Sequence, residues 1–120
     1  MVSMRADRVA EEMKKEISSI IENQVKDPRI GFVTIISVEI SNDLRHAKVF
    51  VSALGTDEER TRSMEGLEQA KGFIRRETAQ RINLRYAPEI VFKSDKSIEH
   101  GVKIAQMLSK LKEGEEERKD

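Results

Sequence analysis

Residues 56–86 read TDEERTRSMEGLEQAKGFIRRETAQRINLRY, and this stretch decides how the rest of the chain can fold. At 100° per residue its apolar side chains share one helical face, as expected of a helix that packs on a core. That stripe consists of Met64, Leu67, Ala70, Ile74, Thr78 and Ile82. Phe73 lies about 100° off the stripe and follows Gly72, a residue that costs about 1 kcal/mol relative to alanine inside a helix. We therefore expect a kink or break at Ala70-Lys71-Gly72, which would give two shorter helices joined by a bend.

The same stretch concentrates positive charge. Between Gln69 and Tyr86 there is one acid, Glu77, and there are five bases: Lys71, Arg75, Arg76, Arg81 and Arg85. This imbalance predicts a surface that attracts phosphate, with Arg76, Arg81 and Arg85 extending it toward a third strand. The alternative is a solvated helix in which the arginines pair with acids such as Glu77.

Length and composition limit the class of protein. A chain of 120 residues is expected to form one domain, and the absence of cysteine excludes disulfides and thiol chemistry. No apolar run approaches the roughly 20 residues of a membrane span, and the charged start is that expected of a cytoplasmic protein. The formal net charge is zero, but residues 113–120 carry five acids and two bases. We expect a single domain over residues 1–112, followed by a flexible acidic tail at 113–120.

The first half of the chain predicts a helix and a hairpin. A helix capped by Ser3 should run to about Val25, and Asp27-Pro28-Arg29 should stop it. Its inward stripe is Ala6, Val9, Ala10, Met13, Ile17, Ile20 and Ile21. Residues 31–41 are rich in β-branched side chains and predict a strand; a turn at 41–44 and a return strand at 45–52 should follow.

After the central helix, the chain predicts one more strand and one more helix. Residues 86–93 should form a short strand, and Pro88 near its start indicates an edge position or the strand entry. A last helix, capped by Asp95 or Ser97, should run through Leu111. Its inward side chains would be Ile98, Val102, Ala105 and Leu108.

The resulting order, α-β-β-α-(kink)-α-β-α, predicts an α+β fold with a three-stranded sheet and helices on one face. It is similar to the second type of KH domain, an RNA-binding fold with a GxxG loop between two helices. No GxxG occurs here, and the equivalent junction is Ala70-Lys71-Gly72. The chain resembles the bacterial ribosome-binding factor A family, whose KH-like fold carries an A-x-G kink instead. The resemblance is carried by Arg5-Ala6-Asp7-Arg8-Val9-Ala10, Asp27-Pro28-Arg29 with Gly31, Ala47-Lys48-Val49-Phe50-Val51, Arg81, Leu84-Arg85, Pro88 and Asp95-Lys96-Ser97-Ile98-Glu99-His100-Gly101.

This resemblance implies a protein that binds the free small (30S) ribosomal subunit and assists late maturation of its 16S rRNA, a need sharpest in the cold. It implies no enzymatic activity and no cofactor. We expect a monomer, because nothing in the sequence demands more. Ribosomal proteins are further expected contacts. The alternative is a protein-interaction module that docks a partner on its exposed strand and hairpin without touching RNA.

Other candidate residues leave alternatives open. Arg5 and Arg8 lie near a helix N-terminus, where cations are unfavourable, so either phosphate contact or pairing with Glu11 or Glu12 would explain them. Arg45 and Lys48 fit phosphate contact, and lysine on an edge strand also guards against aggregation. His46 and His100 lack the partners that a metal site or catalytic base needs. We expect Phe32, Phe50 and Phe92 in the core, while Phe73 could stack on a base.

Overall fold

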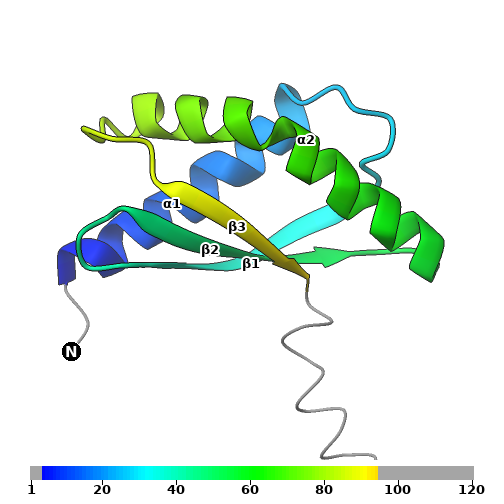
Figure 1. The fold of residues 1–120 in the computed structure, drawn as a ribbon, viewed down its shortest axis with the longest axis horizontal. Helices are drawn as coiled ribbons and strands as arrows, with labels where there is room; N and C mark the ends of the chain where they lie inside the picture. Colours follow the sequence, from blue (N-terminus) through cyan, green and yellow to red (C-terminus); the bar gives the residue numbers. More distant parts are fainter. Residues whose placement is uncertain (1–3, 95–120) are drawn as a thin grey trace, which may run out of the picture.

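Residues 4–94, which the computed structural model describes, form two helices and a three-stranded sheet (Figure 1). In chain order the elements are α1 (Met4–Asn23), β1 (Val33–Ile40), β2 (His46–Ala53), α2 (Asp57–Arg81) and β3 (Glu89–Ser94). The α+β fold, the element order and the hairpin expected from the sequence are confirmed over this range. The expected cap at Ser3, the last helix to Leu111 with His100, and the acidic tail 113–120 lie outside the described residues.

The sheet has the order β1-β2-β3. β1 and β2 form an antiparallel hairpin, whereas β3 pairs with β2 in parallel and is an edge strand. Pro88 directly precedes β3, so its missing N–H removes no hydrogen bond from the ladder, and the prediction of a strand entry is confirmed. The register of the hairpin shifts between Ile35 and Ser37. Because of this bulge, both Ile35 and Val38 contact the core although they are three residues apart.

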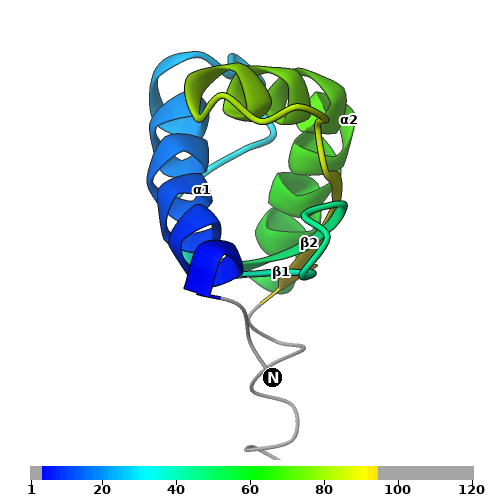
Figure 2. The same cartoon turned by 90° about the vertical axis from the view of Figure 1, so that its left-hand side faces the viewer.

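Both helices lie on one face of the sheet (Figures 1 and 2). Along β2 the buried side chains are Ala47, Val49, Val51 and Ala53, which is the period of two expected of a strand covered on one side. The predicted stripe of α1 supplies the opposite wall, with Met13, Ile17 and Ile20 fully buried. Within the described residues, the other face of the sheet has no helix over it (Figure 2).

The helix α2 is continuous from Asp57 to Arg81, so of the expected kink or break at Ala70-Lys71-Gly72 the break into two shorter helices is wrong. Its axis instead bends part-way along, as Figure 1 shows. Gly72 has a negative φ, and an added Cβ would meet only Arg76 Nη1 at 3.5 Å. The helical cost of this glycine, about 1 kcal/mol, is smaller than the gain of about 1.5–3 kcal/mol from burying each of Leu67 and Ile74 on either side of it.

A close contact joins α2 to the turn that follows α1. The Ser63 hydroxyl accepts a hydrogen bond from the Gly31 N–H (3.1 Å) and donates one to the Arg29 carbonyl (3.4 Å). One turn further along α2, a Cβ on Gly66 would lie 2.6 Å from Ile30 Cγ1. Two small residues on one helical face therefore let the turn backbone approach α2 directly.

The turn itself is held by Asp27. Its carboxylate accepts hydrogen bonds from the Arg29 side chain (2.7 and 3.1 Å) and from the Arg29 backbone N–H (2.9 Å). These hydrogen bonds lower the pKa of Asp27 from 3.8 to about 2. The residues Asp27-Pro28-Arg29, which were expected to stop the first helix, thus form a turn that is held together by hydrogen bonds between Asp27 and Arg29.

The prediction that Phe32 belongs to the core is wrong, because Phe32 is 81% exposed. It precedes β1 at the end of the sheet remote from the hairpin turn, and its carbonyl accepts a hydrogen bond from Leu54, which is 67% exposed. Phe92 is partly buried and packs against the core as expected. The expectation that Phe50 belongs to the core is wrong, because Phe50 alternates with the buried residues of β2 and lies on the open face of the sheet. Phe73 lies off the buried face of α2 as expected.

Candidate nucleic-acid interface

Arg75 is a structural clamp. Its Nε donates to the Pro88 carbonyl (2.8 Å) and its Nη2 to the Ala87 carbonyl (3.1 Å). The same Nη2 lies 3.3 Å from the Glu89 carboxylate. These contacts fix α2 to the entry of β3, so this guanidinium is directed at the protein's own backbone.

Lys71 and Arg81 each have a carboxylate partner. Lys71 pairs with Glu68 on its own helix. Arg81 donates to Glu16 Oε1 (3.2 Å) and to the Ser19 hydroxyl (3.3 Å), both on α1, and Glu77 lies 3.9 Å from its Nε. The expectation that Arg81 extends toward the third strand is wrong, because the bend of α2 turns this end of the helix over α1.

The remaining predicted cations form a different group. No ion pair among residues 4–94 involves any of them, and all of them are exposed. This group consists of Arg5, Arg8, Arg45, Lys48, Arg76 and Arg85. Lys71, Arg75 and Arg81 therefore pair with carboxylates, as the alternative of a solvated helix expects. A phosphate-binding surface would have to be formed by the other six side chains.

Tyr86 gives part of this group a defined geometry. The Arg45 guanidinium carbon lies 4.3 Å from the centre of the Tyr86 ring, and that of Arg85 lies 5.6 Å from it. These are cation–π distances, and Tyr86 remains 51% exposed. Tyr86 was not among the residues expected from the sequence, although an aromatic residue next to an arginine in a basic loop is a usable signal.

Three segments that are far apart in the sequence lie at one end of the molecule. The N-terminal end of α1, the β1–β2 turn and the loop from α2 to β3 all face the viewer in Figure 2, and they lie at the left of Figure 1. Arg5 and Arg8 come from the first segment, Arg45 from the second and Arg85 from the third. We call this end, with Tyr86, the arginine end.

Acidic groups moderate the charge of the arginine end without neutralising it. Asp43 accepts hydrogen bonds from the Ser41 hydroxyl (2.6 Å) and the Arg45 backbone N–H (3.0 Å). These hydrogen bonds, together with the nearby charges of His46 and Arg45, lower the pKa of Asp43. Lys48 lies opposite Glu39 across the β1–β2 ladder. Asp43 thus orders the turn that carries Arg45 and leaves the guanidinium of Arg45 on Tyr86.

Residues 4–94 contain no group of three or more histidine, cysteine, aspartate or glutamate side chains that could hold a metal ion. His46 is exposed and belongs to the sheet face that the helices leave open. Neither described helix is long and apolar enough to cross a membrane.

The three-stranded sheet, with a bent helix and no GxxG loop, defines a small α+β domain of the KH-like class. A family model described as ribosome-binding factor A matches residues 5–108, and the chain belongs to this family. A ribosome-binding factor A from Halothermothrix orenii is 55% identical over 116 residues, which cover 97% of this chain and 95% of the relative.

Solved structures agree with this fold. The solution structure of a Thermotoga maritima protein, described as a ribosome binding factor A candidate, is 41% identical and has a TM-score of 0.67. It covers 78% of this chain and 89% of its own. A Thermus thermophilus ribosome binding factor A, fitted as a homology model into the electron-microscopy map of a 30S complex, has a TM-score of 0.62 and is 22% identical. That match covers 76% of this chain and 96% of the Thermus one, and at this identity it supports the fold alone.

Proposed function

We propose that this protein is a non-catalytic factor that binds the free 30S ribosomal subunit in the cytoplasm and assists late maturation of 16S rRNA. Family membership supports the ribosomal partner. The single observation that carries an RNA contact is the arginine end. There the fold brings together cations from three separate segments, and none of them is paired with a carboxylate among the described residues.

The chemistry of this end suits folded RNA. Guanidinium groups form bidentate hydrogen bonds with phosphate and also stack on bases. Tyr86, with Arg45 at 4.3 Å, provides a planar surface beside two positive charges, which fits an unpaired nucleotide and its phosphates. Binding energy spent on one rRNA arrangement would raise the population of that arrangement without any covalent step, so the factor needs no catalytic group.

The test measures association with purified 30S subunits as a function of salt. Each phosphate contact contributes a slope of about −0.7 to −0.9 in log affinity against log salt concentration, so the Arg45→Ala, Arg85→Ala double variant should reduce the slope by about 2. Arg62→Ala is the matched control, because Arg62 is exposed on the N-terminal half of α2 and lines pockets away from the arginine end. An unchanged slope in the double variant, with the fold intact, would remove the arginine end from the interface.

The fold also offers a surface for the alternative, a module that docks a protein. Phe32 and Leu54 are exposed side by side at the opposite end of the hairpin, and they line a pocket of about 560 Å³ with Arg29 and Arg62. Exposed aromatic and arginine side chains are typical of protein contacts. If Phe32→Ser abolishes subunit binding while the double arginine variant does not, the protein-docking function is favoured.

A further inference from the structure

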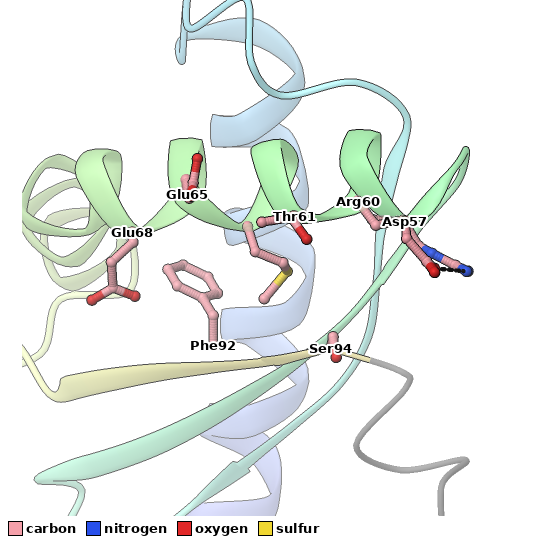
Figure 3. A pocket seen from close by; sticks show the side chains of 9 residues that line it. Asp57, Arg60, Thr61, Glu65, Glu68, Phe92 and Ser94 are labelled. Carbon is pink, nitrogen blue, oxygen red and sulfur yellow. Dashed lines mark hydrogen bonds and ion pairs between the residues drawn. The ribbon is translucent and has the colours of Figure 1, made fainter.

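An open groove lies between the N-terminal half of α2 and the edge strand β3 (Figure 3). Its volume is about 430 Å³, and its apolar lining comes from Met64 on the helix together with Phe92 and Ala53 on the sheet. In Figure 3 the Phe92 ring points from β3 toward the helix, yet Phe92 stays only partly buried. The described residues thus leave unfilled apolar space on the helix-covered side of the sheet.

The rim of the groove is acidic. Asp57, Glu65 and Glu68 line it along α2, with Arg60 as the one base among the lining residues. Arg60 pairs with Asp57 at 3.1 Å, and Glu68 pairs with Lys71, which is not one of the lining residues. Such a rim repels phosphate and favours a cationic, apolar occupant.

The chain that follows β3 has this composition. Residues 95–112 contain four lysines and two acids. On a helical projection one broad arc is mainly apolar, with Ser109 and Lys112 also within it, and the opposite arc holds only polar side chains. The apolar arc comprises Ile98, Val102, Ile104, Ala105, Leu108 and Leu111; the polar arc comprises Lys96, Glu99, Lys103, Gln106 and Lys110.

The last described residue lies at the groove. Ser94, the last residue of β3, is itself one of the lining residues (Figure 3). Ile98 follows four residues later, so it can lie no further than about 14 Å from Ser94. A short connection of this kind gives an effective concentration in the millimolar range. The family match also continues past Ser94 as far as Leu108, which places this segment within the family's domain.

We infer that residues 98–111 form a helix that packs its apolar arc into the groove between α2 and β3 of the same molecule. The occupant would cover Met64 and Phe92, and the lysines on its opposite arc would point to solvent, where they contribute only a long-range attraction to the acidic rim. Docking would extend the helix layer over the β3 side of the sheet.

Disulfide trapping in the full chain tests this inference, because the native sequence has no cysteine. Met64→Cys is combined in turn with a single cysteine at each position from 101 to 108, and each double variant is oxidised at low protein concentration. We expect intramolecular disulfides whose yield peaks every three or four residues, with at least a fivefold lower yield at 103 than at 105. The same series with Arg62→Cys, on another side of α2, is the control and should give uniformly low yields.

Other trapping results would overturn the inference. A flat or undetectable yield with Met64→Cys shows that the groove is not occupied by this segment. Disulfides that form only between two molecules show that the occupant is a second copy.

A stability measurement provides a second readout that is independent of register. Ala105→Asp places a charge in the apolar arc, and Gln106→Asp places the same charge in the polar arc one residue away. We expect Ala105→Asp to lower the Tm by about 5 °C and Gln106→Asp to change it by less than about 2 °C. Equal shifts in the two variants would contradict packing of this arc on the domain.

Discussion

Arg75 offers the sharpest separation between a structural cation and an RNA-binding one. Its guanidinium donates to two backbone carbonyls, those of Ala87 and the buried Pro88. A charge-assisted hydrogen bond contributes about 1.5–3 kcal/mol, but this side chain is 29% exposed, so water can replace part of the loss. The pair with Glu89, whose side chain is 63% exposed, adds at most about 1 kcal/mol.

From these contacts we expect Arg75→Ala to lower the free energy of unfolding by about 2–3 kcal/mol. Arg75→Lys keeps the charge but loses the two-pronged geometry, and it should lose about 1–2 kcal/mol. Arg76→Ala is the neighbouring control; Arg76 is exposed and outside the ion pairs of residues 4–94, so its change should stay within about 0.5 kcal/mol. Urea unfolding followed by circular dichroism measures all three variants.

Binding to 30S subunits under native conditions completes the comparison. If Arg75→Ala unfolds with an unchanged midpoint while its subunit affinity falls strongly, the assignment of Arg75 as a clamp is refuted and its charge belongs to the interface. The clamp also means that charge reversal at Arg75 disturbs the entry of β3, so such a variant does not test RNA contact by itself.

Three further perturbations follow from the same structure. Gly72→Ala should stabilise the protein by about 0.5–1 kcal/mol, because there is space for a methyl group at this position. Gly66→Ala should destabilise the protein by about 1–2 kcal/mol, because the added methyl group would collide with Ile30 in the 27–31 turn. Urea unfolding measures both changes, and changes of the same sign would contradict this prediction. Thr78 is fully buried, and its hydroxyl has no hydrogen-bond partner among residues 4–94. Thr78→Val should therefore raise the free energy of unfolding by about 1 kcal/mol, and a loss in the same assay would reveal a hidden partner. The hydrogen bonds from Arg29 hold the pKa of Asp27 at about 2, below its ordinary 3.8, so their contribution is complete above about pH 4 and is lost as the pH falls toward 2. The free energy of unfolding of Asp27→Asn should therefore fall less between pH 4 and pH 2 than that of the native protein. Parallel plots of unfolding free energy against pH would show that the Asp27 carboxylate does not contribute to stability.

Local sequence patterns predicted most of the secondary structure. The α1 stripe, the β-branched run of β1 and the Pro88 entry to β3 are short-range signals, and each element formed within about three residues of its expected bounds. Gly72 does not end α2. Its penalty of about 1 kcal/mol is too small for that, because Leu67 and Ile74 on either side of it are both buried. The exposure of Phe32 could not be predicted from its local sequence, because a hydrophobic side chain at the end of a strand is buried only if another element covers it.

The sequence by itself determined which cations exist and that residues 69–86 carry an excess of them. Only the tertiary structure decided their roles. Arg81 reaches Glu16 across the helix layer and Arg75 reaches the carbonyl before β3, whereas Arg45 and Arg85 meet on Tyr86 and keep no carboxylate among the described residues. The physical reason is that a charge is neutralised by whatever lies within a few ångströms, and those neighbours come from distant parts of the chain.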